Sequence, residues 1–517
     1  MNPSPARTND QPRPAEWHTA TQAAAEAEPR HSLWQAVARS VRDNIIAEFA
    51  VQAIRLGGFV LLARKLTPDD FGVFRVLMVV GVLATLTNAT GLSDALVQRR
   101  EITAAHETTA WWVGMMLALC AAAILYAAAG ALAQLMAMPR LGAGARLLCV
   151  PVLLDATTVV PNARLRRRLN FSVLAAADVV AETGFILVAL AVLWRSLPAW
   201  SLPAGLAARI ALRAMVIWSA EPYVPRGWMS LSAWRDFSHF STAAWSSGIV
   251  YIFSSNSDYL LVGRLLGSSA LGFYGMAWDL LRFVPDRLHR VAGRVTFPAF
   301  CQLQEDREAL AHAYLDFFDY TSRVVLPIAV CAAIAAPEIL RTIYGPQWVP
   351  STVPMRLLAP GLALSGLRLG IGPVYYSKNR PMYDLYLHGI RLTLLVIAVL
   401  GLARWQLFGV SAGMSMVEGT VSVLGQWLAC ALIGLSLGHL AMAAGSALRL
   451  TAVCAAATLA GKTLGWVAIG SGAISSHSIV LAAAALPPAL LYLWLERSHA
   501  MDLIGRAFVP THAQAKA

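Results

Sequence analysis

The sequence predicts an all-α integral membrane protein of about fourteen transmembrane helices, in two similar six-helix halves followed by two more helices. The chain has 517 residues, of which 57% are hydrophobic and 14% are charged, whereas a soluble protein carries about 25% charged residues. Its apolar residues come in blocks of about 20, the length at which a helix crosses the hydrocarbon core. The phrase "LLARKLTPDDFGVFRV" at 61–76 also returns as "LVGRLLGSSALGFYGM" at 261–276. A constant offset over such a phrase indicates an internal repeat.

The apolar blocks define the expected helices in order. The repeated phrase falls between the first and second spans and again between the seventh and eighth, so each half has six helices. An even number returns the chain to its starting side, which predicts parallel repeats about an axis along the membrane normal. The spans are expected at 44–65, 72–96, 109–134, 144–162, 171–194, 200–221, 240–265, 271–298, 319–343, 351–374, 383–403, 409–434, 444–468 and 475–495.

These spans set the domain boundaries. The N-terminal residues hold Pro, Ala and charge without an apolar stretch, so a cleaved signal peptide is not expected there. We therefore expect a disordered or amphipathic cytoplasmic N-terminus at 1–40. The predicted units after it are an N-lobe at 41–222, a cytoplasmic linker at 223–239, a C-lobe at 240–435, two spans within 436–497, and a cytoplasmic tail at 498–517.

The arginines and lysines of the short loops predict the orientation. With the N-terminus inside, the larger basic clusters are all cytoplasmic: "RR" at 99–100, "RLRRR" at 164–168 and "KNR" at 378–380. Both termini are then cytoplasmic. Arg64 and Arg264 lie at the outer face, where we expect them to reach lipid phosphates.

Cysteines and net charge exclude other classes. The six cysteines show no CxxC pair and mostly sit inside apolar blocks, so we interpret them as packing residues and expect no metal site. The formal net charge is +12, but the arginines are scattered between membrane blocks. We therefore expect anionic lipids as partners and no nucleic acid.

Several phrases resemble a known family. "VLLARKLTPDDFGVFRVLMVV" with "ATGLSDALVQRREIT", and "DYLLVGRLLGSSALGFYGMAWDLLRFVPDRLHRV" with "FPAFCQLQEDREALAHAYLDF", are similar to bacterial polysaccharide and lipopolysaccharide (Wzx-like) flippases. These belong to the multidrug/oligosaccharidyl-lipid/polysaccharide exporter superfamily. The resemblance covers most of residues 40–440.

The resemblance implies two lobes facing each other in a V, in the bacterial inner membrane. It also implies a function: moving an undecaprenyl-diphosphate-linked oligosaccharide from the cytoplasmic to the periplasmic leaflet by alternating access, for exopolysaccharide, O-antigen or capsule synthesis. No cofactor is expected, and the chain lacks the GxxxxGK[ST] signature of an ATP site. A polymerase and other polysaccharide assembly proteins are expected as further partners.

The densest charge inside a span lies on the eighth. Asp279, Arg282, Asp286, Arg287, Arg290 and Arg294 fall within an arc of about 140° on a helix. Such a face lines a water-filled lumen or meets charged partners. We predict that the four arginines bind the diphosphate through paired N–H donors. The alternative is compensation within the helix, by Asp279–Arg282 and Asp286–Arg290 pairs. Pro285 is expected to kink the helix there.

Other ionisable residues are placed by depth. Asp178 lies level with Arg213, and Glu182 with Arg209, on the antiparallel fifth and sixth spans. We interpret them as two structural ion pairs, the alternative being a proton or Na⁺ site. Arg55 and Arg391 each interrupt an apolar stretch and are added to the substrate-binding candidates. Depth gives no partner for Asp155, Asp258, Arg323, Arg368 or Glu418.

Two rival functions remain open. An ion-coupled multidrug antiporter would share the fold, but a cationic drug favours a carboxylate-rich cavity. A membrane polysaccharide polymerase or glycosyltransferase would need catalytic groups at a membrane face, and the paired acids Asp69 and Asp70 lie in a turn too short to hold a donor sugar. "TPDDFG" is better interpreted as a helix start, with Thr67 as cap and Pro68 at the first helical position. We predict a transporter with no catalytic residues; the glycan, coupling ion, pathway and oligomeric state stay open.

Overall fold

The structure is a computed structural model that describes residues 47–87, 91–99, 101–470, 480–485, 488–489 and 492. The predicted N-terminal segment 1–40 and tail 498–517 lie outside these residues. Throughout the described chain the regular secondary structure is helical, which confirms the predicted all-α class. Within it, eight helices are long and apolar enough to cross a membrane, or nine if one bent pair is a single span. Two of these, Gly248–His289 and Met382–Ile433, each overlap two predicted spans, so the total of fourteen stays a prediction.

The first half of the chain follows the predicted order, with one span broken. Thr157 and Thr158 donate side-chain hydrogen bonds to the carbonyls of Leu154 and Asp155, which bends helices. The two parts of the fourth span meet there at 45°. The elements are a helical segment at 47–63, α2 (Pro68–Thr87), α3 (Ser93–Gln98), α4 (Ala104–Leu135), α5 (Pro139–Leu147), α6 (Cys149–Ala156), α7 (Val159–Arg167), α8 (Phe171–Trp194) and α9 (Pro198–Ala220).

The second half begins with the long helix α10 (Leu231–Gln302), which contains the predicted seventh and eighth spans. It breaks at Gly267, where φ is 87° and ψ is 174°, a conformation essentially confined to glycine. The remaining elements are α11 (Arg307–Ile334), α12 (Ala336–Ile339), η2 (Leu340–Tyr344), η3 (Pro346–Ser351), α13 (Thr352–Gly366), η4 (Leu367–Gly370), α14 (Ile371–Ser377), α15 (Met382–Leu402), η5 (Ala403–Trp405), α16 (Gln406–Ile433) and α17 (Leu437–Gly470).

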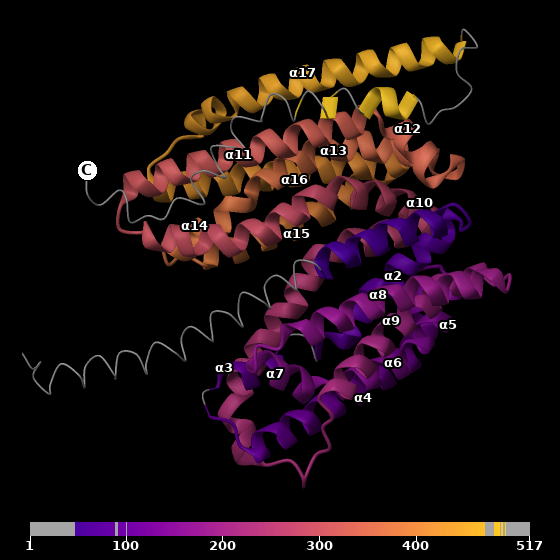
Figure 1. The fold of residues 1–517 in the computed structure, drawn as a ribbon, viewed down its shortest axis with the longest axis vertical. Coiled ribbons are helices and arrows are strands. Elements are labelled where there is room, and N and C mark those ends of the chain that lie inside the picture. Colours follow the sequence, from indigo (N-terminus) through magenta and orange to yellow (C-terminus); the bar gives the residue numbers. More distant parts are fainter. Residues whose placement is uncertain are drawn as a thin grey trace, which may run out of the picture.

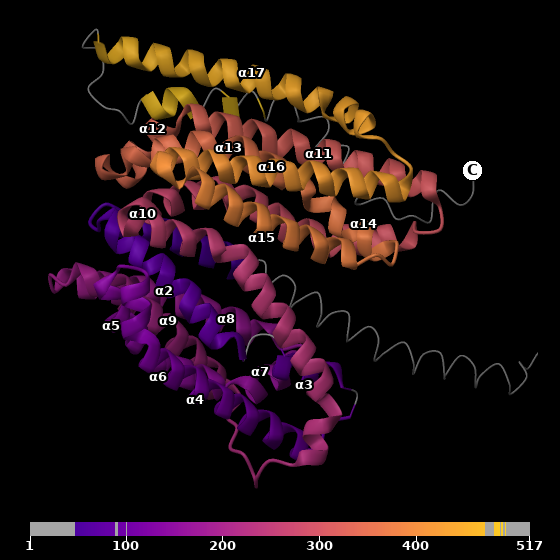
Figure 2. The same cartoon turned by 180° about the vertical axis from the view of Figure 1, so that it is seen from behind.

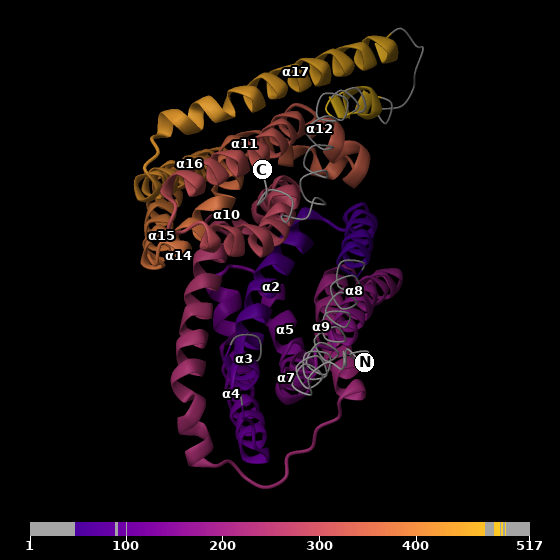
Figure 3. The same cartoon turned by 60° about the vertical axis from the view of Figure 1, so that its left-hand side comes forward.

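The helices form two groups that meet at one end and diverge toward the other, as the V-shaped arrangement predicts (Figures 1 and 2). One group contains α2–α9 and the other contains α11–α17, while α10 runs along both (Figure 3). The first turns of α10 pack on the first group, since Ser241 donates a hydrogen bond to the carbonyl of Gly91 and Asp236 pairs with Arg99. Because α10 begins at Leu231, its first turns lie inside 223–239, the segment that the sequence predicts to be a cytoplasmic linker. The lobe boundaries at 222 and 240 stay predictions.

The two copies of the repeated phrase contact each other at the end where the groups meet. A Cβ atom on Gly72 would lie 1.8 Å from the Ser268 carbonyl oxygen, and one on Gly272 would lie 1.9 Å from that of Pro68. The two contacts are the same contact made twice, because an offset of 200 converts one into the other. The phrase therefore recurs because each copy is the packing partner of the other.

Further hydrogen bonds close the same end. Trp348 Nε1 donates to the Ala63 carbonyl at 2.8 Å, and Ser268 Oγ donates to Asp69. Arg64, which we expected to reach lipid phosphate, donates instead to the carbonyls of Thr342 and Ile343 at the C-terminal end of η2. Unpaired carbonyls at a helix end attract a guanidinium. We call the end of the molecule where these hydrogen bonds and the two glycine contacts lie the closed end.

Candidate substrate cavity

A polar cavity of about 700 Å³ lies among the helices of the second half. It is bounded by α10, α13, α14, α15 and α16, with η4 between α13 and α14. Its aromatic lining includes Tyr251 and Trp278. The charged residues that line it are Arg282, Asp286, Arg368, Asp384, Arg391 and Glu418.

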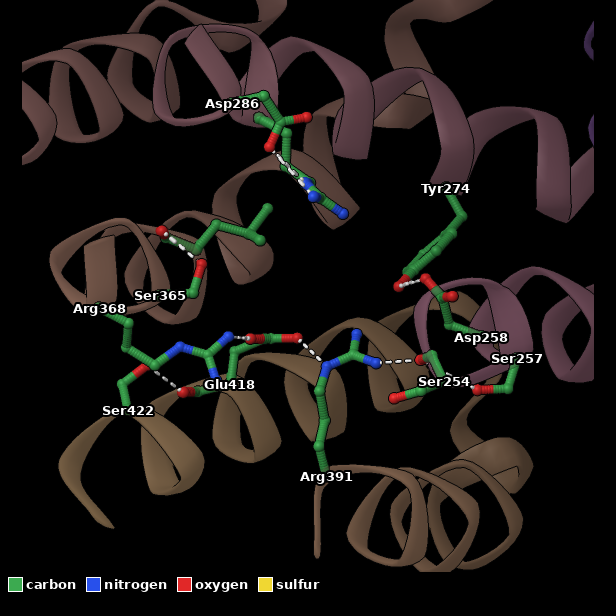
Figure 4. Close-up of polar contacts among 12 residues, drawn as sticks. Ser254, Ser257, Asp258, Tyr274, Asp286, Ser365, Arg368, Arg391, Glu418 and Ser422 are labelled. Atoms are coloured by element: carbon green, nitrogen blue, oxygen red, sulfur yellow. Dashed lines mark hydrogen bonds and ion pairs between the residues drawn. The ribbon is translucent and has the colours of Figure 1, made fainter. Parts of the chain in front are cut away.

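Glu418 is the centre of the charge network in this cavity (Figure 4). Its side chain is 4% exposed. Its Oε1 accepts from Arg391 Nε at 2.7 Å, and its Oε2 accepts from Arg368 Nη2 at 3.1 Å. The far side of the Arg391 guanidinium donates to the backbone carbonyl of Ser254 on α10. One carboxylate and two guanidinium groups thus join four elements: α10, α15, α16 and η4.

Arg282 lines the cavity, and its carboxylate partner is not Asp279, the residue considered in the alternative interpretation. Its guanidinium lies 3.0 Å from Asp286, one helical turn away, and 5.6 Å from the centre of the Trp278 ring. The considered pairing with Asp279 is wrong, because Asp279 pairs with Arg75 of α2. This inter-lobe ion pair could not be inferred from the spacing along a single helix.

The other predicted arginines of the eighth span are placed differently. Arg287 donates to the carbonyl of Phe283 at 3.2 Å, and its guanidinium lies over the Phe283 ring at 4.3 Å. It is not among the cavity-lining residues. Arg290 and Arg294 lie on α10, but their side chains are outside the described part of the structure.

A second, smaller polar cavity of about 430 Å³ lies in the first half, between the segment 47–63, α8 and α9. Arg55 holds Glu182 through two hydrogen bonds of 2.9 Å, one to each carboxylate oxygen. Arg209, the partner predicted from depth, lies 3.9 Å from Glu182. Arg213 and Asp178 are brought together as predicted from depth, at 2.8 Å. Each half therefore holds a buried glutamate between two arginines.

Two contacts of the site were not predicted from the sequence. Arg75 interrupts the apolar α2 and stands opposite Gly275, its counterpart in the repeat, whose missing side chain makes room for the guanidinium. An arginine in one copy of the repeat and a glycine at the equivalent position of the other could have indicated this contact from the sequence. Asp258 is 1% exposed and accepts a hydrogen bond from Tyr274 at 3.0 Å. Its other oxygen has no hydrogen-bond partner in the described part of the chain.

The basic cluster at 164–168 is held within the first half. Arg164 contacts Glu107 at 2.6 Å and Glu221 at 3.3 Å, and Arg168 contacts Glu221 at 2.6 Å. Arg166 pairs with Asp94. These arginines fasten α7 to neighbouring segments, so the positive charge of this cluster is largely matched by acidic side chains.

Comparison with solved structures shows which known fold the chain has. The fold is similar to that of the lipid II flippase MurJ in an inward closed conformation, with a TM-score of 0.68 at 14% identity over 89% of this chain and 99% of that one. It is also similar to an inward-facing transporter of the MATE family of the MOP superfamily, with a TM-score of 0.62 at 14% identity over 76% and 98%. An outward-facing MATE transporter gives 0.51 at 15% identity over 77% and 95%. The chain has the fold of this class of membrane transporters.

Sequence comparison gives the family. The model of the family described as "Polysaccharide biosynthesis protein" matches residues 61–353, more than half of the chain, and the chain belongs to this family. It is similar to the succinoglycan biosynthesis transport protein ExoT of Rhizobium meliloti (strain 1021), at 27% identity over 62% of this chain and 65% of the relative. It is also similar to the lipopolysaccharide biosynthesis protein WzxC of Escherichia coli (strain K12), at 22% identity over 68% and 71%. It is a multi-pass protein of the bacterial inner membrane.

Proposed function

We propose that the protein is a flippase that moves an undecaprenyl-diphosphate-linked oligosaccharide from the cytoplasmic to the periplasmic leaflet by alternating access, for surface polysaccharide synthesis. The observation that carries the proposal is the convergence of Arg282, Arg368 and Arg391, from α10, η4 and α15, on one cavity. The names of the relatives support it, since they include a succinoglycan transport protein and a lipid II flippase. A transporter of this kind is not an enzyme and needs no catalytic residue.

The carboxylates of the cavity orient its arginines without using all of their hydrogen-bond donors. A guanidinium has five N–H groups, and Glu418 takes one from Arg391 and one from Arg368. The remaining N–H groups suit phosphate oxygens, to which arginine donates in pairs. We propose these three arginines as the diphosphate site, Arg55 as a second station in the first half, and Arg287, Arg290 and Arg294 as further cations on the same helix.

Charge balance in the cavity favours a carrier that binds and then releases an anion. The three arginines face three carboxylates, those of Asp286, Asp384 and Glu418, so the empty cavity is formally neutral. Three uncompensated cations inside a membrane would be costly. An entering diphosphate competes with these carboxylates for the same donors, which limits the affinity and permits release on the other side.

The conformation fits one stage of an alternating-access cycle. The closed end lies at the repeated phrase, whereas α3, α7 and α14 lie where the two groups diverge (Figure 2). The basic clusters lie at or just after the C-terminal ends of these elements, so we propose that the divergent end faces the cytoplasm and that both termini are cytoplasmic. The higher TM-score against the inward-facing than the outward-facing MATE structure, 0.62 against 0.51, supports this assignment.

The multidrug antiporter alternative is less well supported by the cavity. A cationic drug in this cavity would meet three guanidinium groups, which repel it. Of the three carboxylates that could attract it, Asp286 and Glu418 already form ion pairs with these arginines. We propose the lipid-linked glycan as the substrate, and a polymerase and other assembly proteins as partners that would receive it.

Replacing the cavity arginines tests the proposal. Arg282→Ala, Arg368→Ala or Arg391→Ala should greatly reduce polysaccharide export while the protein still reaches the membrane. Lysine at position 282 should restore export incompletely, because it keeps the charge but loses the paired donors. The measurement is finished polysaccharide at the surface, with glycan-loaded carrier assayed for its resistance to a periplasmic ligase.

Arg404→Ala is the matched control, since Arg404 lies in η5 over the ring of Trp405 and outside the cavity. It should export normally. Normal export from a variant with all three cavity arginines changed to alanine would show that the substrate is held elsewhere.

A further inference from the structure

An apolar groove of about 670 Å³ lies on the far side of α13 from the substrate cavity. Its walls are aliphatic side chains of α11, α13 and α17, among them Leu326, Val330, Ala363 and Leu364. The upper group of helices in Figure 1 contains all three elements. Nothing in the transport cavity uses this groove, so it needs a separate explanation.

Two cationic side chains stand at one end of the groove. Arg356 Nε donates to the carbonyl of Ala333 at 3.2 Å, and Lys462 Nζ donates to that of Ile334 at 3.2 Å. Both cap the last carbonyls of α11, which is an ordinary structural role. Lys462 is also neutralised by Glu338 at 3.1 Å. Arg356 is exposed and has no carboxylate in ion-pair contact among the described residues, so its terminal N–H groups remain available.

The length of the groove matches one leaflet of a membrane. From Arg356 to Leu364 on α13, and from Ile334 back to Leu326 on α11, the walls run eight residues, or about 12 Å at 1.5 Å per residue. Half of the hydrocarbon core measures about 15 Å. A groove of this length whose cation stood at headgroup level would end close to the bilayer midplane.

We infer that this groove binds one anionic glycerophospholipid of the leaflet on the closed side, with its phosphate on Arg356 and one acyl chain between α11 and α13. The apolar walls exclude a polar ligand, and the guanidinium at the mouth selects a phosphate that carries net negative charge. The inference does not depend on the proposed transport activity.

The site has a consequence for the substrate cavity because α13 is shared. Leu362, Ser365 and Gly366 of α13 line the cavity, while Ala363 and Leu364 line the groove. Pro360, within the same helix, removes one backbone hydrogen bond and makes the helix easier to bend. An acyl chain bound in the groove would therefore pack against α13, the helix that also forms one wall of the substrate cavity.

Native mass spectrometry of the full chain, titrated with phosphatidylglycerol or with phosphatidylcholine of the same acyl chains, tests the inference. We expect one phosphatidylglycerol to be retained per chain, in preference to phosphatidylcholine. Arg356→Gln should weaken phosphatidylglycerol binding about tenfold, the effect of one charged hydrogen bond, and leave phosphatidylcholine unchanged. Val330→Trp should remove both lipids by filling the groove.

The matched controls are Arg341→Gln and Ile328→Trp, which change exposed residues near the same end or on the same helix but outside the groove. Both should bind as the unchanged protein does. Equal retention of the two lipids, or normal phosphatidylglycerol binding by Arg356→Gln, would overturn the inference. Displacement of phosphatidylglycerol by undecaprenyl phosphate at lower concentration would overturn it too, and would assign the groove to the carrier tail.

Discussion

Glu418 is the most constrained side chain of the candidate site, because one buried carboxylate compensates two guanidinium groups at once. Arg391 is 7% exposed and Arg368 is 23% exposed, so neither is well placed to be solvated if that carboxylate is lost. The Asp178–Arg213 pair of the first half differs, since the side chain of Asp178 is 54% exposed. Loss of the carboxylate should therefore have a much smaller energetic effect at Asp178 than at Glu418.

Glu418→Gln should lower the free energy of unfolding by about 3–5 kcal/mol, because it leaves buried guanidinium charge without a counter-charge. The measurement is the thermal unfolding of purified protein in detergent. Asp178→Asn is the matched control and should cost no more than about 1 kcal/mol, as exposed pairs do. Equal losses in the two variants would mean that Glu418 is well solvated and does not hold the network together.

The sequence predicted where charged residues lie along the helices better than it predicted which residues form ion pairs with them. Spacing on a helix placed Arg282 in a charged stripe, and depth placed Asp178 level with Arg213. Neither method could find a partner on a third helix, which is why Arg55 rather than Arg209 makes the closest contacts to Glu182. The pairing of Arg75 with Asp279 depends on how the two halves meet, which is a tertiary property.

Among the elements, the turns of the repeated phrase are the most tightly specified. Gly72 and Gly272 each face a backbone carbonyl closer than any Cβ atom tolerates. A backbone cannot move aside as a flexible side chain can, so any larger residue must separate the two turns. Periodicity and the repeat predicted where these turns lie. The bend between α6 and α7 and the short η segments could not be predicted from the sequence, because local side-chain hydrogen bonds and packing decide them.

Gly272→Ala should loosen the closed end, since its Cβ atom would lie 1.9 Å from the Pro68 carbonyl oxygen. A cysteine introduced at Ser268 should then react faster with a membrane-impermeant maleimide, after subtraction of the labelling of the natural cysteines. Gly57→Ala is the control, because its Cβ atom would meet nothing within 4 Å. Unchanged labelling in Gly272→Ala would show that the turns do not hold that end shut.

On the scale of the whole molecule, the two halves touch at the closed end and diverge beyond it (Figures 1 and 2). If transport requires alternating access, these contacts must break in each cycle. Arg75, Trp348 and Ser268 each contribute an inter-half contact there or close by. Linking the halves covalently at this end should therefore arrest the protein in one state.

A disulfide between cysteines introduced at Asp69 and Ser268, whose side chains are hydrogen-bonded, should abolish polysaccharide export, and a reductant should restore it. The readout is surface polysaccharide before and after reduction, with cross-linking followed by gel mobility. The two single-cysteine variants serve as controls and should export in both conditions. Normal export by fully cross-linked protein would contradict a cycle in which the closed end opens.

The reciprocal contact of Gly72 with Ser268, and of Gly272 with Pro68, also bears on how such a chain could arise. Two identical half-length polypeptides, inserted in the same direction, would form this contact as an isologous homodimer. A gene duplication that fused them would keep it on both sides of the axis. Away from this contact the two halves could then change independently. The difference between Arg75 and its counterpart Gly275 allows the Arg75–Asp279 ion pair, which a symmetrical ancestor would have lacked.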